Sequence, residues 1–156
     1  MPKSKSSKID RVSITRVELN VLMAAKPLRV WKALINQTGA WWPRGFFTDE
    51  RAVTMKFEPK LGGLLYEDWG KGRGRTWFRI ETFDPPRMLE MSGTLFSSFG
   101  GPGITTVRIE VEAAGKGTLF KLSDAMFGRV DRGTKRSFEE GWNELFAKAL
   151  KSFVER

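Results

Sequence analysis

Few side chains in this 156-residue chain could do chemistry, because it contains no cysteine and no histidine. Thiol nucleophiles, disulfides, thiolate metal sites and imidazole acid/base catalysis are therefore excluded. Any proton transfer must come from carboxylates, lysines, arginines, hydroxyl groups or the single tyrosine, Tyr66. Such work requires a titratable group in a place shielded from water.

Asp124 is the first candidate for such a group. It follows an alternating apolar run, and the alternation places it on the same face as Phe120 and Leu122. A carboxylate inside an apolar cavity has a raised pKa, so it could act as a base or hold a polar group of a ligand. The competing interpretation, a surface residue or a partner for an arginine, is more frequent for an isolated acid.

Glu67, within "LLYED", is the second candidate and carries the same two interpretations. It shares a face with Leu65 and Trp69 if those residues point inward. The opposite register would instead place Leu64, Tyr66 and Asp68 there, and the sequence leaves both registers open.

Other patterns favour simpler interpretations. "KGRGRTWFR" interleaves cations with aromatics, as single-stranded nucleic-acid surfaces do, but a hairpin turn that exposes Lys71, Arg73 and Arg75 accounts for it and is favoured. The glycines at 62–63 and 100–103 do not open a helix after a strand, so no dinucleotide or phosphate loop is expected. No acidic cluster has metal-ligand spacing. We therefore expect no metal, no cofactor and no nucleic-acid partner.

The charge is unevenly distributed. The formal net charge is +9, which attracts anionic surfaces, and part of it lies in residues 1–12, where cations stand among serines with almost nothing to bury. We expect a flexible basic tail over residues 1–12, which is favoured over a nucleic-acid-binding arm, and a single domain over residues 13–156. The apolar runs are far shorter than the ~20 residues that span a bilayer, so we expect a cytoplasmic protein without a membrane span.

The spacing of the apolar residues changes from strand-like alternation to helical periodicity at Pro27. Residues 13–23 alternate, which predicts a half-buried strand, and the segment from Pro27 to about residue 36 has helical spacing. The stretch "GAWWPRGFF" at 39–47 follows, and Pro43 and Gly45 keep it short or irregular.

About six further strands are predicted between residues 53 and 127. Their runs are separated by the turn segments "EPKLGG", "GKGRG", "DPP", "FGGPG" and "GKG". No helix-length pattern interrupts them, which favours an antiparallel meander over alternating strands and helices.

The last segment predicts a long amphipathic helix. One apolar stripe contains Phe138, Trp142, Leu145, Phe146, Ala149, Leu150 and Phe153. Gly141 within this helix costs about 1 kcal/mol against alanine, so it indicates either close approach of another backbone or room for a ligand.

In the order of these elements and their motifs, the chain resembles the SRPBCC (START-like, helix-grip) superfamily, and within it the proteins related to the activator of heat-shock-protein-90 ATPase. The resemblance rests on motifs in the family's order from about residue 15 to the end: "KPLRVWKAL", "WWP", "EPKLGGLLYE", "DPPRML", "GTLFKLSD" and "GWNELFAKALKSFV". It implies an α+β helix-grip fold. In that fold a curved antiparallel sheet of about seven strands wraps around a long C-terminal helix, with two short helices after the first strand.

The resemblance also implies a cavity between the sheet and the C-terminal helix. Trp41 and Trp42 would then lie on the second short helix, one packed inward and one near the entrance, either as a hydrophobic plug or as a ligand gate. Relatives often carry a histidine near position 124, so Asp124 departs from histidine-dependent chemistry. The candidate ligand-binding residues are Trp41, Trp42, Phe46, Tyr66, Glu67, Trp69, Met91, Phe120, Asp124, Phe138 and Trp142.

Three functions remain open from the sequence. The favoured one is binding of a small hydrophobic or aromatic molecule, because residues that line a cavity are abundant and residues for catalysis are sparse. The second is a cyclase- or aromatase-like enzyme that uses Asp124 and Glu67, with Tyr66 as a donor. The third is an interaction module for an acidic protein partner, as the related activator domain binds a chaperone.

Overall fold

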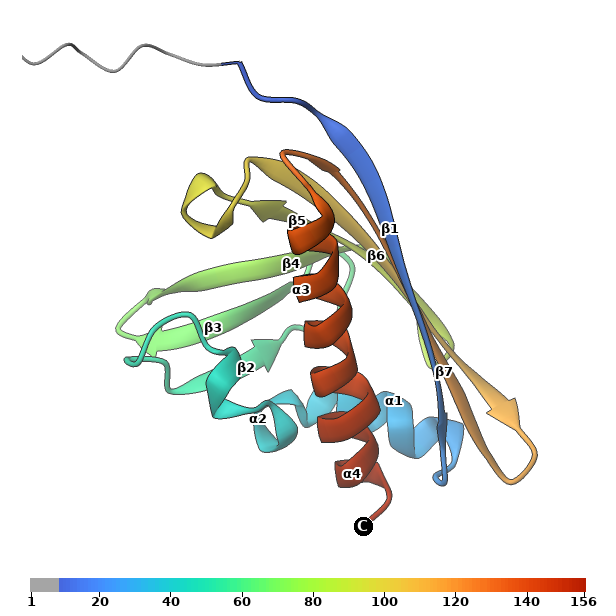
Figure 1. Ribbon diagram of the computed structural model, residues 1–156. Helices are drawn as coiled ribbons and strands as arrows, with labels where there is room; N and C mark the ends of the chain where they lie inside the picture. The colour runs from blue at the N-terminus through green and yellow to red at the C-terminus, as the bar shows by residue number, and fades with distance from the viewer. Residues whose placement is uncertain (1–8) are drawn as a thin grey trace, which may run out of the picture.

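The computed structural model describes residues 9–156, which fold as one antiparallel sheet around one long helix (Figure 1). After strand β1 (Ser13–Met23) come the helices α1 (Pro27–Asn36), α2 (Thr38–Trp41) and η1 (Arg44–Phe46). Six strands follow: β2 (Thr54–Phe57), β3 (Leu64–Gly70), β4 (Arg73–Asp84), β5 (Met88–Leu95), β6 (Gly103–Ala114) and β7 (Gly117–Gly128). A short 3-10 turn, η2 (Ser97–Phe99), lies between β5 and β6. The predicted element order is confirmed.

The sheet has seven strands in the order β1-β7-β6-β5-β4-β3-β2, and each neighbouring pair is antiparallel. Strands β2 to β7 form the expected meander, and β1 joins it beside β7. The sheet curves around the C-terminal helix, so one face is covered by that helix and the other faces outward (Figure 1).

The C-terminal helix is continuous from Arg132 to Val154, as α3 (Arg132–Trp142), η3 (Asn143–Leu150) and α4 (Lys151–Val154). It starts with a capping box, in which the Asp131 carboxylate accepts from the Thr134 backbone N–H and the Thr134 side chain accepts from the Asp131 N–H. Its middle part, η3, is wound as a π-helix, a form that is rare and frequent near functional sites. The predicted apolar stripe contacts the sheet, with Trp142, Leu145, Phe146 and Leu150 fully buried.

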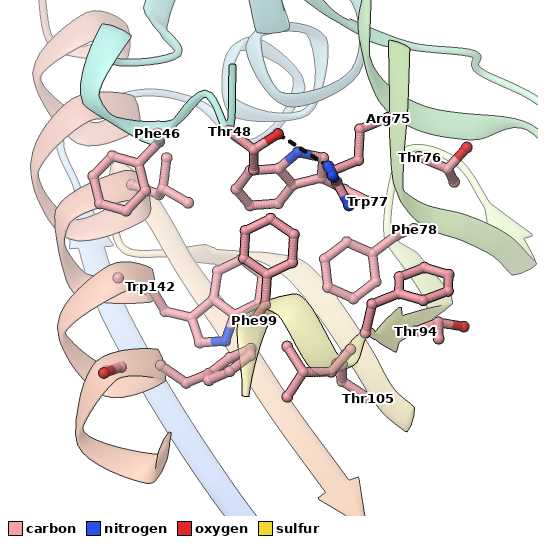
Figure 2. Close-up of a pocket in the computed structure, with 16 residues that line it drawn as sticks. Phe46, Thr48, Arg75, Thr76, Trp77, Phe78, Thr94, Phe99, Thr105 and Trp142 are labelled. Atoms are coloured by element: carbon pink, nitrogen blue, oxygen red, sulfur yellow. Dashed lines mark hydrogen bonds between the residues drawn. The ribbon is translucent and has the colours of Figure 1, made fainter. Parts of the chain in front are cut away.

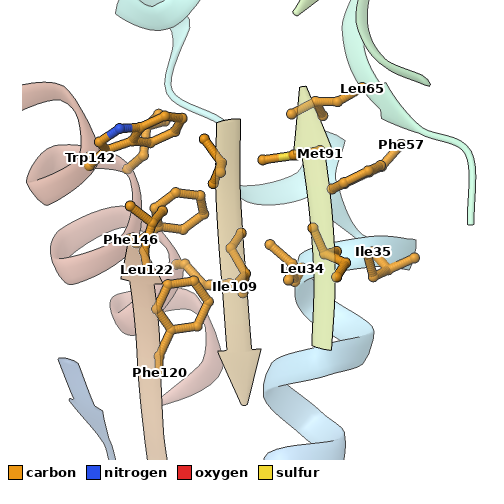
Figure 3. Close-up of a cluster of buried hydrophobic side chains, with 14 of the residues drawn as sticks. Leu34, Ile35, Phe57, Leu65, Met91, Ile109, Phe120, Leu122, Trp142 and Phe146 are labelled. Atoms are coloured by element: carbon orange, nitrogen blue, oxygen red, sulfur yellow. The ribbon is translucent and has the colours of Figure 1, made fainter. Parts of the chain in front are cut away.

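The solid part of the core lies where α1 closes the gap between sheet and helix. Pro27 starts α1, and its buried face carries Val30, Trp31, Ala33, Leu34 and Ile35. Helix α1 packs against β6, β7 and α4. Figure 3 shows this layer, with Phe120, Leu122, Ile109 and Phe146 on one side and Leu34, Ile35, Phe57 and Met91 on the other.

The predicted boundary between a basic tail over residues 1–12 and a domain from residue 13 stays a prediction. Residues 9–12 are exposed and precede β1, whereas residues 1–8 lie outside the described residues, so the basic tail stays a prediction. Within residues 9–156, every helix is too short or too polar to cross a membrane.

Candidate functional site

A cavity of about 310 Å³ lies between α3 and the strands β4 to β6 (Figure 2). It occupies the opposite end of the helix from the solid core. Its wall is mostly aromatic and aliphatic, with five hydroxyl side chains and one charged side chain. The lining residues are Phe46, Thr48, Arg75, Thr76, Trp77, Phe78, Thr94, Leu95, Phe96, Phe99, Thr105, Ser137, Phe138, Gly141, Trp142 and Leu145.

A β-bulge in β4 determines which side chains this strand presents to the cavity. Phe78 pairs with Leu65 and Thr76 pairs with Tyr66, so Trp77 is left without a partner on β3. The extra residue changes the parity of the strand at this point. As a result Arg75, Trp77 and Phe78 all line the cavity, which strict alternation would not allow.

Gly93 on β5 makes room for the Phe78 ring. A Cβ atom at Gly93 would lie 2.9 Å from two atoms of that ring and 2.5 Å from the Trp77 carbonyl oxygen. A side chain at this position would therefore push Phe78 out of place. The absence of one lets the ring lie against the strand and form part of the cavity wall.

The helix contributes Phe138, Gly141, Trp142 and Leu145 from successive turns. A Cβ atom at Gly141 would meet only the Phe46 ring, at 3.6 Å, which is an ordinary contact. Of the two purposes that the sequence suggested for Gly141, room in the cavity therefore applies, and close approach of another backbone does not.

The rim of the cavity is exposed. Phe96 and Phe99, beside the turn η2, keep 56% and 47% of their surface accessible. The Arg75 guanidinium stacks over Phe99, with Cζ 4.6 Å from the ring centroid, and its Nε donates to Thr48 Oγ1 at 3.1 Å (Figure 2). These contacts place a cation at the edge of an apolar space.

Glu67 is fully buried behind Trp77, which forms part of the cavity wall. Of the two registers of β3 that the sequence left open, the structure therefore has the one in which Leu65 and Glu67 point inward. Its carboxylate accepts from Trp77 Nε1 at 2.7 Å, from Trp69 Nε1 at 3.1 Å, and from the Thr48 backbone N–H at 2.9 and 3.0 Å. Both tryptophans lie at β-bulges, since Trp69 is also left without a partner between the β3 and β4 pairs. The carboxylate thus holds together two irregular strand segments and Thr48, in the loop after η1.

Asp124 is also fully buried and lies behind Trp142, on the face that Phe120 and Leu122 share. Its Oδ2 accepts from Trp142 Nε1 at 2.9 Å, whereas Oδ1 and the neighbouring Thr105 Oγ1 are buried without a hydrogen-bond partner in residues 9–156. Burial raises the pKa of Asp124, and the Trp142 indole acts against this rise. The Thr105 hydroxyl also acts to lower the pKa of Asp124, although it does not meet the geometry of a hydrogen bond.

Three of the eleven candidate residues line the cavity: Phe46, Phe138 and Trp142. Trp41 and Trp42 are both buried in the core; Trp41 donates to the Ala33 carbonyl and contacts Phe146, while Trp42 donates to the Phe46 carbonyl and packs edge-on against Trp77. They form a plug that supports the cavity wall from behind, and neither forms the entrance.

The other six candidates lie elsewhere for identifiable reasons. Met91 and Phe120 belong to the solid core beside α1. Tyr66 lies in a separate depression at the β2 edge, with Lys56 and Gly39, because the inward positions of β3 are taken by Leu65 and Glu67. Trp69, Glu67 and Asp124 lie behind or beside the cavity wall without lining it.

Sequence reasoning missed most of the sheet side of the cavity. The sequence pattern predicts Arg75 to be an exposed turn residue, and it gives no signal for a role of Trp77, Phe78, Phe96 and Phe99. The bulge in β4 that orients Arg75, Trp77 and Phe78 has no recognisable sequence signature. Gly93 within an otherwise regular strand pattern is the one local signal, since an isolated glycine in a strand indicates a bulge or a close approach.

No cluster of three or more acidic side chains that could hold a metal ion is found across residues 9–156. The polar groups that could contact a molecule in the cavity are the five hydroxyl groups of its wall and the guanidinium at its rim. The arrangement can enclose an apolar group and orient a polar one, but it brings no carboxylate into contact with the enclosed space.

Comparison with known proteins places this geometry in a fold. No protein-family model and no curated protein sequence matches the chain. Among solved structures, that of Ara h 8.0201 has a TM-score of 0.68 at 14% identity and covers 91% of this chain and 98% of its own. The Aha1 dimer from Colwellia psychrerythraea has a TM-score of 0.62 at 16% identity, covering 90% and 96%.

A third similar structure, CalU16 from Micromonospora echinospora, has a TM-score of 0.61 at 17% identity and covers 94% of this chain and 87% of its own. The three structures share the fold of this chain. They match nearly the whole described chain, and at this low identity the likeness concerns architecture. The chain therefore has the helix-grip fold that its sequence motifs implied.

Proposed function

We propose that this protein binds a small hydrophobic or aromatic molecule in the cavity between the sheet and the C-terminal helix. The observation that carries the proposal is the convergence of aromatic rings on one enclosed space. Cavities of about 300 to 1,000 Å³ with apolar walls and a few polar groups are typical small-ligand sites. The rings come from η1, β4, the β5–β6 connection and α3: Phe46, Trp77, Phe78, Phe96, Phe99, Phe138 and Trp142.

The volume restricts the size of the ligand. At about 310 Å³ the cavity is at the small end of such sites, which suits one or two fused rings rather than a long polycyclic molecule. Affinity would come from apolar area, at about 25 cal/mol per Å² before the costs of association, and from edge-on ring contacts.

Binding is favoured over proton-transfer catalysis by the position of the acids. A catalytic base must come within hydrogen-bond reach of the proton that it removes. Asp124 and Glu67 lie behind the cavity wall, and both oxygens of Glu67 already accept hydrogen bonds from Thr48 and the two indoles. Tyr66, the donor in the enzymatic hypothesis, lies in a different depression.

Tryptophan fluorescence and thermal unfolding against a panel of hydrophobic and aromatic molecules would test the proposal. Trp77 and Trp142 line the cavity, so a bound molecule should quench their emission saturably. It should also raise the melting temperature, because a ligand that binds only the folded chain stabilises it by mass action.

A matched pair of helix variants locates the site. Gly141→Leu adds a side chain that projects into the cavity, whereas Glu140→Leu adds the same side chain to an exposed position one residue away. We expect Gly141→Leu to weaken binding at least tenfold and Glu140→Leu to leave it unchanged. Equal affinity in both variants would show that the ligand binds elsewhere. If no molecule of the panel changes the tryptophan fluorescence or the melting temperature of the unmodified chain, the proposal is contradicted. The chain, with its net charge of +9, would then be tested for a macromolecular partner.

A further inference from the structure

Arg75 is the one charged side chain among the sixteen that line the cavity in the described chain. The remaining lining side chains are apolar or carry a hydroxyl group. An ionic group of a ligand could therefore pair with an opposite charge only at Arg75. Arg75 is only half-buried, at the rim where Phe99 is exposed. A cation at the rim of an apolar cavity can reach the polar end of a molecule whose body lies inside.

The guanidinium is held in place by groups that leave most of its donors unused. Nε donates to Thr48 Oγ1 at 3.1 Å, and the plane lies over the Phe99 ring, 4.6 Å from Cζ to the centroid. Within residues 9–156, Nη1 and Nη2 have no hydrogen-bond or ion-pair partner. Four N–H groups therefore remain available in a fixed fork, which matches a carboxylate in geometry.

The nearest acid does not neutralise this cation by direct pairing. Glu67 is opposite Arg75 in the strand register, yet its oxygens accept from the two indoles and the Thr48 backbone, and no ion pair joins it to Arg75. Glu67 is thus stabilised by neutral donors. The same residue, Thr48, positions both groups, with its N–H toward Glu67 and its hydroxyl toward Arg75.

We infer that the ligand is a small aromatic acid, with its ring among the aromatic side chains and its carboxylate paired with Arg75 at the rim. The inference rests on the proposed function and adds the charge of the ligand to it. The net charge of +9 supports capture of an anion, because a positive field raises its association rate. The exposed Arg73, two residues earlier on the same strand, adds to this field without lining the cavity.

Calorimetric titration of the full chain with 2-naphthoate and 2-naphthamide tests the inference. The two probes share a ring system and nearly the same shape, and only the first is charged at neutral pH. We expect 2-naphthoate to bind at least tenfold more tightly, since hydrogen bonds to charged groups have about this effect. Raising the salt concentration should weaken the binding of 2-naphthoate and leave the binding of 2-naphthamide unchanged.

Two variants separate a local contact from the general field. Arg75→Gln should lower the affinity for 2-naphthoate about tenfold, to that of 2-naphthamide, and should leave 2-naphthamide binding unchanged. Arg73→Gln removes the same charge outside the cavity and should change either affinity less than twofold.

The outcomes distinguish this inference from the proposal on which it rests. Equal binding of the two probes would overturn the anionic ligand, and an equal loss in the Arg73 and Arg75 variants would overturn the pairing with Arg75. Either result would keep the cavity as a binding site. Failure of both probes to bind the unmodified chain would contradict cavity binding itself.

Discussion

At the scale of single residues, two buried carboxylates have different relations to their surroundings. Glu67 is completely satisfied, with both oxygens accepting from indole and backbone donors. Asp124 is only half satisfied, because Oδ1 has no partner in the described chain. The first carboxylate organises the strands around it, whereas the second lies where burial disfavours its charged form and one oxygen has no partner in the described chain.

Replacement of Glu67 by glutamine should destabilise the protein. Glutamine offers one acceptor oxygen where the carboxylate offers two, so its amide group would oppose an indole N–H and leave it without a partner. We expect a loss of about 1 to 3 kcal/mol in the free energy of unfolding, measured by chemical denaturation. Glu50→Gln, the same charge change at an exposed residue, should cost almost nothing. If both variants unfold alike, the carboxylate of Glu67 does not hold the bulges.

Replacement of Asp124 by asparagine should stabilise the protein at neutral pH. Burial raises the pKa of Asp124 in the folded state above the ordinary value of 3.8, so the folded chain binds this proton more tightly than the unfolded chain does. The residue therefore lowers stability progressively as pH rises from 3.8 through the raised pKa. Asparagine stays neutral, can accept from Trp142, and can donate to Thr105.

We expect Asp124→Asn to raise the free energy of unfolding by about 1 to 3 kcal/mol at pH 7, by removing the charge and satisfying Thr105. The difference from the unmodified chain should decrease as pH falls through the raised pKa toward 3.8, and should be constant below 3.8, where both side chains are neutral. Denaturation curves at several pH values measure it. A variant less stable at pH 7 would mean that the charged form is favoured in the folded chain.

At the scale of elements, irregularities rather than regular segments build the cavity. The two bulges of the β3–β4 hairpin aim Trp69 and Trp77 at Glu67 and bring Arg75 and Phe78 to the same side. On the other wall, α3 supplies Gly141, which is separated from the π-helical segment η3 only by Trp142. Each departure from ideal geometry places or removes a side chain at the enclosed space.

Replacement of Gly141 by alanine should reveal an opposition between stability and cavity size. Alanine favours the helix by about 1 kcal/mol, and its Cβ fits at 3.6 Å from the Phe46 ring. We expect a higher melting temperature together with weaker binding of the aromatic probes, because the added methyl group occupies cavity space. A melting temperature below that of the unmodified chain would indicate that the helix needs glycine at this position for its backbone geometry.

At the scale of the whole molecule, the space between sheet and helix is filled at one end and hollow at the other. Helix α1 and the lower part of the C-terminal helix close the first end with the Phe120, Leu34 and Phe146 layer (Figures 1 and 3). Within residues 9–156, no second helix covers the sheet beside α3, where the cavity opens at Phe96 and Phe99. The position of α1 along the sheet therefore decides which aromatic residues become core and which line the cavity.

That division explains which parts of the site could be predicted. Phe138 and Trp142 follow from helical periodicity, which relates residues within one turn. Phe120 and Met91 have equally good inward patterns, yet they lie in the filled layer, because periodicity gives the face of a strand and not the depth along it. Trp77 and Arg75 escape prediction because a bulge changes strand parity without a distinctive residue type.

The sequence by itself determined the element order, the antiparallel meander and the apolar stripe of the terminal helix, because these depend on local periodicity and turn chemistry. It also excluded histidine and cysteine chemistry outright. Only the tertiary structure decided the register of Glu67, the core position of Trp41 and Trp42, and the place of Arg75 at the cavity rim. These depend on strand pairing and on the packing of α1, which join residues that are distant in the chain.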